Sequence, residues 1–210
     1  DLPQNYYEVV IPSEYKTKKG ALYKARALQF ALETNVSQLK EDDWIVHLDE
    51  ESQLTKSAVN GIIEFLNKDK HQIGQGLITY GKCGKIVNWT TTLMDTIRVA
   101  IDLGPCKFSL KYLHKPIYCF KGSFVVCKNS VEKNVSFDHG FEGSITEDAY
   151  FAVKASGMGY TFDWIEGEIL EKSPYYFIDL LKQRRRWVQG LILVATSRNL
   201  KRDYAGVIFR

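Results

Sequence analysis

Apolar residues recur along the chain with two periods, one typical of strands and one typical of helices. The run Trp44-Ile45-Val46-His47-Leu48 is almost continuously apolar, which predicts a strand buried on both faces of a parallel sheet. A helix is expected to begin directly after Thr55, its N-cap, because the apolar positions that follow share one helical face. Further strands are expected at residues 8–12, 76–80, 118–128 and 160–164, and further helices at residues 19–33, 88–103 and 144–156.

The order of these elements predicts the fold class. Strands separated by helices indicate an α/β domain with a mainly parallel central sheet flanked by helices, and such a sheet has its ligand crevice at the carboxyl ends of the strands. Gly104 is expected to stop the helix at residues 88–103. Ser173-Pro174, a cap followed by proline, is expected to start a long last helix. We expect residues 1–210 to form a single domain of a longer protein, because the chain opens directly into a strand-like run without a cap or linker.

Composition narrows the classes of function. A chain of 210 residues with 45% hydrophobic content is long enough to bury a substantial core. Its net charge of +3 is mild and its basic residues are dispersed outside residues 182–186, so no nucleic-acid partner is expected. A run of about 18 apolar residues is missing, so the chain as given is expected to be soluble. The four cysteines lack metal-ligand spacing and are expected to be mostly reduced thiols, which favours a reducing compartment.

Carboxylates follow the apolar strand directly, in Asp49-Glu50-Glu51-Ser52. Residues two apart in an extended chain point the same way, so Asp49 and Glu51 can converge while Glu50 turns aside. Two hard oxygen ligands at the ligand edge of a sheet suit Mg²⁺ or Mn²⁺ shared with a diphosphate. An acidic turn that caps the next helix is an equally good interpretation of the same residues.

A second acidic pair, Glu147 and Asp148, lies in the first turn of the helix expected at residues 144–156. The helix dipole and the free N–H groups of this turn stabilise ionised carboxylates, so helix capping is the simpler interpretation. A deprotonated carboxylate held in a crevice is also what a general base requires.

Two glycine-containing pairs mark possible ligand contacts. Gly122-Ser123 interrupts a bulky run, which indicates either a close backbone approach or a bulge. Lys19-Gly20, at the start of the first expected helix, offers N–H groups to an anion and is a weak candidate for nucleotide binding.

The run Gln183-Arg184-Arg185-Arg186-Trp187 lies in the expected last helix. Gln183, Arg186 and Trp187 are at i, i+3 and i+4, so they share a face that suits a ligand with an anionic part and a flat apolar part. Arg184 and Arg185 point elsewhere and are expected to be surface charge, facing solvent or a membrane. A solvated basic helix with a tryptophan in the core is the alternative.

Three of these motifs are Asp49-x-Glu51, Glu147-Asp148 and Gln183-x-x-Arg186-Trp187. In this order along the chain they resemble the motifs of the inverting family 2 glycosyltransferases. Longer runs resemble the Egghead-type β-1,4-mannosyltransferases of invertebrates, from about Tyr15 to Ser197. These runs are Trp44 to Glu51, Gly74 to Tyr80, His114 to Pro116, Gly159 to Phe162, Ile165 to Glu168 and Glu171 to Pro174. The resemblance implies a GT-A type fold and transfer of mannose from GDP-mannose to the 4-hydroxyl of glucosylceramide.

The resemblance also implies roles for the site residues. Asp49 and Glu51 would bind the metal and diphosphate, although the family often has Asp where this chain has Glu51. Asp148 would be the general base, with Glu147 in support. The remaining implied site residues, which would hold the diphosphate and the acceptor, are Gln183, Arg186, Trp187, Gly122 and Ser123.

The family's first nucleotide-binding strand and its membrane helices are expected outside residues 1–210. The full-length protein is then expected in the endoplasmic reticulum or Golgi membrane, with this domain facing the cytosol and contacting the lipid surface. Three alternatives remain: another family 2 transferase or polysaccharide synthase, a sugar-nucleotide-binding module without turnover, and a glycosidase that pairs two carboxylates.

Overall fold

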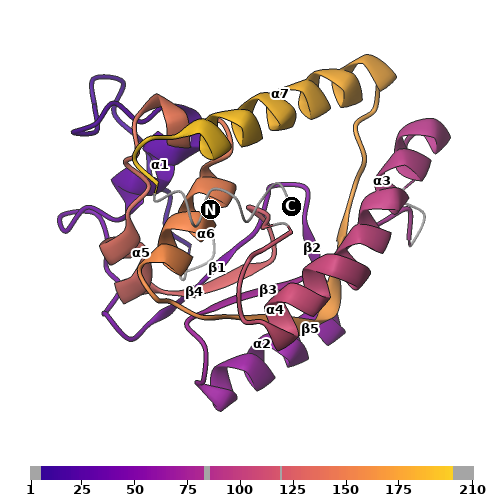
Figure 1. The fold of residues 1–210 in the computed structure, drawn as a ribbon, viewed down its shortest axis with the longest axis horizontal. Helices are drawn as coiled ribbons and strands as arrows, with labels where there is room; N and C mark the ends of the chain where they lie inside the picture. The colour runs from indigo at the N-terminus through magenta and orange to yellow at the C-terminus, as the bar shows by residue number, and fades with distance from the viewer. Residues whose placement is uncertain (1–5, 83–85, 119, 201–210) are drawn as a thin grey trace.

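The computed structural model describes residues 6–82, 86–118 and 120–200, and contains a five-stranded sheet (Figure 1). The strands are β1 (Trp44–His47), β2 (Gln53–Leu54), β3 (Ile73–Tyr80), β4 (Val125–Lys128) and β5 (Phe162–Glu171). They are ordered β1-β4-β3-β5-β2 across the sheet. Only β3 and β5 pair in parallel, whereas β1 with β4, β3 with β4, and β2 with β5 are antiparallel.

The α/β class is confirmed, but the expectation of a mainly parallel sheet is wrong. β1, β3 and β5 point the same way, as the alternation of strands and helices predicts. β4 enters between β1 and β3 in the opposite direction, and the short strand β2 adds an antiparallel edge. The pattern of apolar residues shows that a segment is a strand, but it carries no information on the direction in which a strand enters the sheet.

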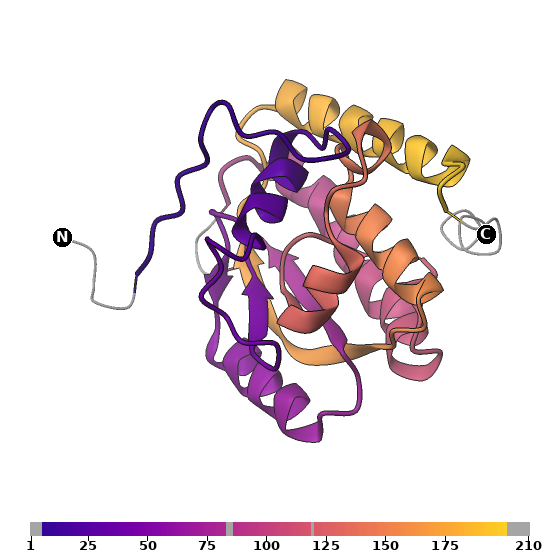
Figure 2. The ribbon, with the colours of Figure 1, turned by 90° about the vertical axis from the view of Figure 1, so that its left-hand side faces the viewer.

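Seven α-helices are present in the described residues and pack around this sheet (Figures 1 and 2). They are α1 (Tyr23–Ala31), α2 (Lys56–Lys68), α3 (Trp89–Ile101), α4 (Lys107–Tyr112), α5 (Asn129–Val135), α6 (Glu147–Gly157) and α7 (Phe177–Thr196). A π-helical turn, Asp102–Cys106, joins α3 to α4, and a 3₁₀ turn, Phe141–Gly143, precedes α6.

Neighbouring residues of β4 face opposite sides of the sheet and enter two hydrophobic cores. Val125 and Cys127 join a core that includes residues of α4, α5 and α6. Val126 and the preceding Phe124 join a second core, which includes residues of α2. The sheet is therefore covered on both faces, as the α/β class requires.

The cap residue predicted for the helix after Thr55 is confirmed. Thr55 caps α2, where its Oγ1 accepts a hydrogen bond from the amide of Ala58 over 3.1 Å. Asn88 caps α3 in the same way, through the amide of Thr90 over 2.9 Å. Gly104 does not end this helical segment, because the chain continues through the π turn into α4.

Several other predicted elements differ from the structure. Residues 8–12 are not a strand, the first helix begins at Tyr23, and the last begins at Phe177 and not after Ser173. Of residues 118–128 only Val125–Lys128 form a strand, and position 119 lies outside the described residues. β1 is an edge strand with an exposed Val46, whereas β3 is central and mostly buried.

Two further expectations concern cysteines and membrane segments. Cys127 is a buried free thiol, but Cys106 is disulfide-bonded, so the expectation of reduced thiols is wrong at that residue. Within the described ranges, none of the helices combines the length and the apolar character needed to cross a bilayer.

Candidate active site

The common direction of β1, β3 and β5 brings their carboxyl ends to one edge of the sheet. A cleft of about 1060 Å³ lies at this edge, and Tyr80 and Glu171, the last residues of β3 and β5, line it. Helix α7 passes over this region from the side of α3 toward α6 (Figure 1). The sequence-predicted residues that line the cleft are Asp49, Glu51, Gly122, Ser123, Glu147, Asp148, Gln183, Arg186 and Trp187. Lys19 and Gly20 do not line it, and the Lys19 amide instead donates to Asp138 Oδ2 over 2.7 Å.

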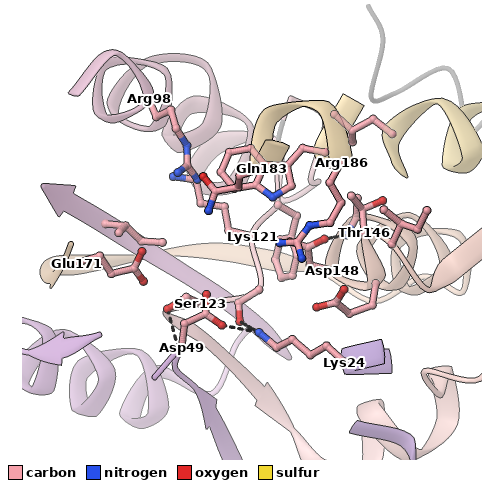
Figure 3. A pocket seen from close by; sticks show the side chains of 18 of the residues that line it. Lys24, Asp49, Arg98, Lys121, Ser123, Thr146, Asp148, Glu171, Gln183 and Arg186 are labelled. Atoms are coloured by element: carbon pink, nitrogen blue, oxygen red, sulfur yellow. Dashed lines mark hydrogen bonds and ion pairs between the residues drawn. The ribbon is translucent and has the colours of Figure 1, made fainter. Parts of the chain in front are cut away.

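Asp49 follows β1 and is held from two sides (Figure 3). Its backbone amide donates to Ser123 Oγ over 3.2 Å, and its Oδ1 accepts a hydrogen bond from Lys24 Nζ over 2.5 Å. Lys24 belongs to α1, and its ammonium also lies 3.4 Å from the carbonyl oxygen of Gly122. A cation that the sequence did not reveal therefore occupies one side of this predicted metal ligand.

Glu51 and Glu171 add further carboxylates beside Asp49. Burial raises the pKa of Glu51, and the charges of Glu171 and Asp49 raise it further. Glu171 is 6% exposed and accepts a hydrogen bond from Ser52 Oγ over 2.7 Å. The carboxyl end of β1 and that of β5 thus form one acidic wall of the cleft.

The acidic pair at the start of α6 completes this wall. Asp148 Oδ1 accepts a hydrogen bond from the Ala149 amide over 2.7 Å, and burial raises the pKa of the Asp148 carboxyl. Burial, together with the charge of Asp148, raises the pKa of Glu147 to about 7. Thr146, the N-cap residue of α6, makes no side-chain capping hydrogen bond. Glu147 and Asp148 are the two acidic residues of this first turn.

Gly122 lies where the polar groups of the acidic wall converge. A Cβ atom on this residue would be 3.3 Å from Lys24 Nζ, 3.5 Å from Asp148 Oδ2 and 3.6 Å from Glu147 Oε1. A larger side chain would enter the space between the ammonium and the two carboxylates. The glycine therefore keeps this space open, consistent with a close backbone approach at this position.

The opposite wall of the cleft is cationic and aromatic. Gln183, Arg186 and Trp187 of α7 line it, as their shared helical face predicts. The guanidinium carbons of Arg98 and Arg184 lie 4.4 Å and 4.2 Å from the centre of the Trp187 ring, within the range of cation–π attraction.

Arg184 is anchored inside the protein and is not surface charge as expected. Its Nη2 forms an ion pair with Asp95 of α3, whose side chain is 1% exposed. Arg98, on the same helix as Asp95, lies 3.6 Å from that carboxylate as well. Arg185 is exposed, so the expectation is wrong for Arg184 and agrees with the structure for Arg185.

The position of α7 over the cleft depends on a close contact with the start of α6. A Cβ atom on Gly190 would lie 2.4 Å from Thr146 Cγ2. Any larger residue would push α7 away from the turn that carries Glu147 and Asp148. This glycine therefore sets the distance between the acidic pair and the cationic wall.

Hydrogen bonds connect the two walls across the floor of the cleft. Ser52 Oγ bonds both Ser123 Oγ, over 2.9 Å, and Glu171. On the other side, the Tyr80 hydroxyl donates to Glu171 Oε2 over 3.4 Å and accepts from Arg98 Nη1 over 2.9 Å. This chain of hydrogen-bonded groups extends from the Asp49 amide to the Arg98 guanidinium, which lies over the Trp187 ring.

Lys121 is a second buried cation beside this floor. Its ammonium forms an ion pair with Asp102, and burial lowers its pKa to about 8 although the Asp102 charge opposes that change. Burial raises the pKa of Asp102 in turn. The pair adds a cation to the cleft lining that no sequence motif indicated.

Eight charged residues that line the cleft were not among the predicted site residues: Lys24, Glu50, Asp95, Arg98, Asp102, Lys121, Glu171 and Lys172. Glu50 is among them although it was expected to turn aside. One signal for three of the others is present in the sequence. Asp95, Arg98 and Asp102 are the only charged residues between positions 88 and 103, and their i, i+3, i+7 spacing places them on one helical face. Such a face indicates a buried or ligand-facing side. Lys24, Lys121 and Glu171 carry no comparable signal.

The acidic wall has the chemistry of a divalent cation site. Carboxylate oxygens are the preferred ligands of Mg²⁺ and Mn²⁺. The pKa of Glu51 is raised by burial and by the charges of neighbouring carboxylates, which a bound cation would offset. Within the described ranges, however, no three Asp, Glu, His or Cys side chains are already arranged to hold an ion. Asp49 and Glu51 therefore fit as protein ligands only if a ligand supplies the other oxygens.

Residues 44–208 match the family model described as glycosyl transferase family group 2. The chain is 53% identical over 191 residues to the β-1,4-mannosyltransferase egh of Drosophila melanogaster, which covers 91% of this chain and 42% of the relative. It is 54% identical over 199 residues to the β-1,4-mannosyltransferase bre-3 of Caenorhabditis elegans, covering 94% of this chain and 44% of the relative. The bre-3 protein of Caenorhabditis briggsae matches with the same identity and coverage. The chain thus spans less than half the length of these curated relatives.

Proposed function

Because the chain belongs to the glycosyl transferase family group 2, we propose that it carries the catalytic site of a β-1,4-mannosyltransferase. In this proposal the donor is GDP-mannose and the acceptor is the 4-hydroxyl of glucosylceramide, a membrane lipid. The relatives at 53% and 54% identity are β-1,4-mannosyltransferases, which supports the transferred sugar and the linkage. The observation that carries the proposal is that all three sequence motifs line one cleft.

Asp148 is the proposed general base. It would accept the proton of the acceptor hydroxyl while that oxygen attacks the anomeric carbon of mannose. The bond from this carbon to the donor diphosphate breaks as the new bond forms, so the α-linked donor yields a β-linked product. Lys24 favours the ionised form of Asp148, because its positive charge opposes the effect of burial on the Asp148 pKa.

Glu147 is proposed to support Asp148 and not to replace it. Its pKa of about 7 means that it exchanges a proton near neutrality, so it can share the proton that Asp148 has taken up. The two carboxylates then act as a pair, and the proton can pass to solvent after each transfer.

Asp49 and Glu51 are the residues that would hold a Mn²⁺ or Mg²⁺ ion together with the donor diphosphate. When bound, such an ion would stabilise the negative charge that gathers on the departing diphosphate. Ser123 would fix the orientation of this segment, because its hydroxyl accepts from the Asp49 amide and bonds Ser52.

The cationic wall is proposed to bind the diphosphate and the acceptor sugar. Arg186 is exposed in the cleft lining and can form charge-assisted bonds to phosphate oxygens, while Gln183 offers an amide. The Trp187 ring would form the floor of the acceptor site. Its position is already fixed by the two guanidinium groups that lie within 4.4 Å of the ring centre.

The proposal is tested with the full-length protein, GDP-mannose, Mn²⁺ and glucosylceramide in mixed micelles. We expect a mannosyl product whose anomeric configuration, measured by NMR, is β. Asp148→Asn is expected to lower turnover by about 10²–10⁴-fold, the usual contribution of a general base, while leaving GDP-mannose affinity within a small factor. Asp163→Asn is the matched control, since this aspartate bonds the amide of Trp164 and lies outside the cleft lining.

The competing functions give different results in the same assay. Donor binding without any β-mannosyl product would overturn the transferase proposal in favour of a binding module. Sugar release that persists with a chelator and without nucleotide would favour a glycosidase. Loss of both turnover and donor binding in Asp148→Asn would show that this residue is structural.

A further inference from the structure

Tyr23, the first residue of α1, combines a strained backbone with an exposed aromatic ring. Its φ angle is +53°, in the left-handed region that bulky residues rarely adopt. The residue is 71% exposed, so packing of the ring in the core does not explain this conformation. Of the non-glycine residues with positive φ in the described ranges, only Tyr23 lines the cleft. Strain of this kind persists where the surrounding structure imposes it, and it is concentrated at functional sites.

The chain is fixed immediately before Tyr23. The Ala21 amide donates to Thr17 Oγ1 over 2.6 Å, and Ala21 itself is 2% exposed. The Leu22 amide donates to Ser144 Oγ over 2.9 Å, which attaches the start of α1 to the segment that precedes α6. Two other parts of the protein therefore set the direction in which the chain enters Tyr23.

The chain is fixed immediately after Tyr23 as well. Ala25 is fully buried. Lys24 extends from α1 to Asp49 on the acidic wall, where its Nζ lies 2.5 Å from Oδ1 (Figure 3). The same ammonium lies 3.4 Å from the carbonyl oxygen of Gly122. Tyr23 thus lies between two anchored parts of the chain, and the strained φ is the conformation that connects them with this residue at the cleft.

The position of Tyr23 identifies the kind of ligand that its ring would contact. A tyrosine ring stacks on flat groups, and nucleobases are the flat groups of sugar-nucleotide donors. Tyr23 adjoins Lys24, which reaches the Asp49 carboxylate that is proposed to hold the donor diphosphate. Trp187, the proposed floor of the acceptor site, belongs to the opposite wall. On the diphosphate side, the flat group of GDP-mannose is its guanine ring.

We infer that Tyr23 is a stacking platform for the guanine base of the donor, held in place by its strained backbone. This inference rests on the proposed function, because it takes GDP-mannose as the donor and places the diphosphate beside Asp49. A ring that is already positioned in the free protein loses little conformational freedom on binding. Glycine would adopt the same φ without strain but would offer no ring. Tyr23 is therefore expected to lower stability and to raise donor affinity.

The test is the affinity of the full-length protein for GDP in the presence of Mn²⁺, measured by isothermal titration calorimetry. Tyr23→Ala is expected to raise the dissociation constant of GDP by about tenfold or more, because stacking of the base on the ring is lost. Tyr23→Phe keeps the ring and is expected to bind GDP like the unchanged protein. Pyrophosphate, which has no base, is expected to bind all variants equally.

Tyr23→Gly separates the effect of the ring from that of the strain. It lacks the ring, as Tyr23→Ala does, so both variants are expected to lose the same factor in GDP affinity. Only alanine keeps the strain of a positive φ, so Tyr23→Gly is expected to melt about 1–2 °C above Tyr23→Ala. Tyr112→Ala is the matched control, because Tyr112 is 66% exposed on α4 and does not line the cleft. It is expected to leave GDP affinity unchanged.

Several results would overturn the inference. GDP affinity that is absent from the unchanged protein, or unchanged in Tyr23→Ala, would do so. An equal loss of pyrophosphate affinity would show that Tyr23 supports the diphosphate site and not the base. If Tyr23→Ala melted no lower than Tyr23→Gly, strain would not hold the ring. Failure of the proposed function is a separate result: a protein that binds GDP but forms no mannosyl product is not a transferase, and its GDP affinity still decides the role of Tyr23.

Discussion

The two walls of the cleft are built by different means. The acidic wall takes Asp49, Glu171 and Asp148 from the ends of two strands and the start of a helix, so each carboxylate is placed by the element next to it. The cationic wall depends on pairs between helices that are distant in the chain, since Arg184 bonds Asp95 across 89 positions. Each carboxylate of the acidic wall is thus positioned by its own strand or helix end, whereas the cationic wall exists only when α3 and α7 are packed together.

This difference has a consequence for stability and for catalysis. Burial raises the pKa of Glu51, Glu147 and Asp148, which means that it destabilises their ionised forms. A bound cation would stabilise these carboxylates. The ion pair between Arg184 and Asp95 instead holds two helices together and fixes the face that Trp187 presents. We therefore expect changes in the acidic wall to alter chemistry and pH dependence, and changes in the Arg184–Asp95 pair to alter stability.

The largest stability effect is expected from Arg184→Gln. It removes the ion-pair partner of the buried Asp95 carboxylate, and an uncompensated buried charge typically costs about 3–5 kcal/mol. We expect a loss of about 3 kcal/mol, at the low end, because Arg98 still lies 3.6 Å from that carboxylate. Urea unfolding at neutral pH measures the change.

Arg185→Gln is the matched control for this prediction. Arg185 is the next residue of the same helix and is exposed, so its replacement is expected to change the free energy of unfolding by less than about 0.5 kcal/mol. Similar losses in the two variants would mean that the Arg184–Asp95 pair contributes nothing particular to the packing of α3 against α7.

The same contrast explains which parts of the site were predictable. Asp49 follows an apolar strand and Asp148 begins a helix, so a local pattern indicates both, and the structure brings them to one cleft. Lys24 reaches Asp49 from 25 positions away, and Arg98 reaches Tyr80 from another element, so no window of sequence contains either contact. For the same reason Arg184 was wrongly predicted to be surface charge. The arginines that follow it are exposed, but its own ion-pair partner is Asp95 on α3.

The fold shows the same limit. The N-cap Thr55 is a local signal and was predicted correctly. The direction of β4 depends on where the preceding helices end relative to the sheet. Gly104 does not end the helical segment, because a π turn continues it into α4. Long-range packing decided both features.

Glu147→Gln is expected to have a smaller, pH-dependent effect on stability. The folded pKa of Glu147 is about 7 against an ordinary value of 4.5, so the native state binds the proton more tightly. Stability is then fully present below pH 4.5 and is lost as pH rises toward 7. The neutral glutamine avoids this loss, so the variant should be more stable than the unchanged chain above pH 7, by about 1–2 kcal/mol after allowance for solvent in the cleft.

Unfolding free energies measured across this pH range check the prediction. Glu64→Gln is the control, because Glu64 is exposed on α2 and its carboxylate side chain is 61% accessible. The difference between Glu147→Gln and the unchanged chain should grow with pH, whereas that for Glu64→Gln should stay flat. A constant difference at all pH values would contradict a raised Glu147 pKa.

The smallest expected effect concerns the hydrogen bonds that join the two walls. Ser52 and Tyr80 contact the two carboxylate oxygens of Glu171 from opposite sides, so Ser52→Ala and Tyr80→Phe should be coupled through this shared partner. A double-mutant cycle on the free energy of unfolding is expected to give a coupling energy of about 0.5–1 kcal/mol. Ser52→Ala combined with Tyr160→Phe, whose hydroxyl bonds Asn134, should be additive. If the first cycle is additive too, the acidic and cationic walls are energetically independent, and the cleft is two sites that face each other.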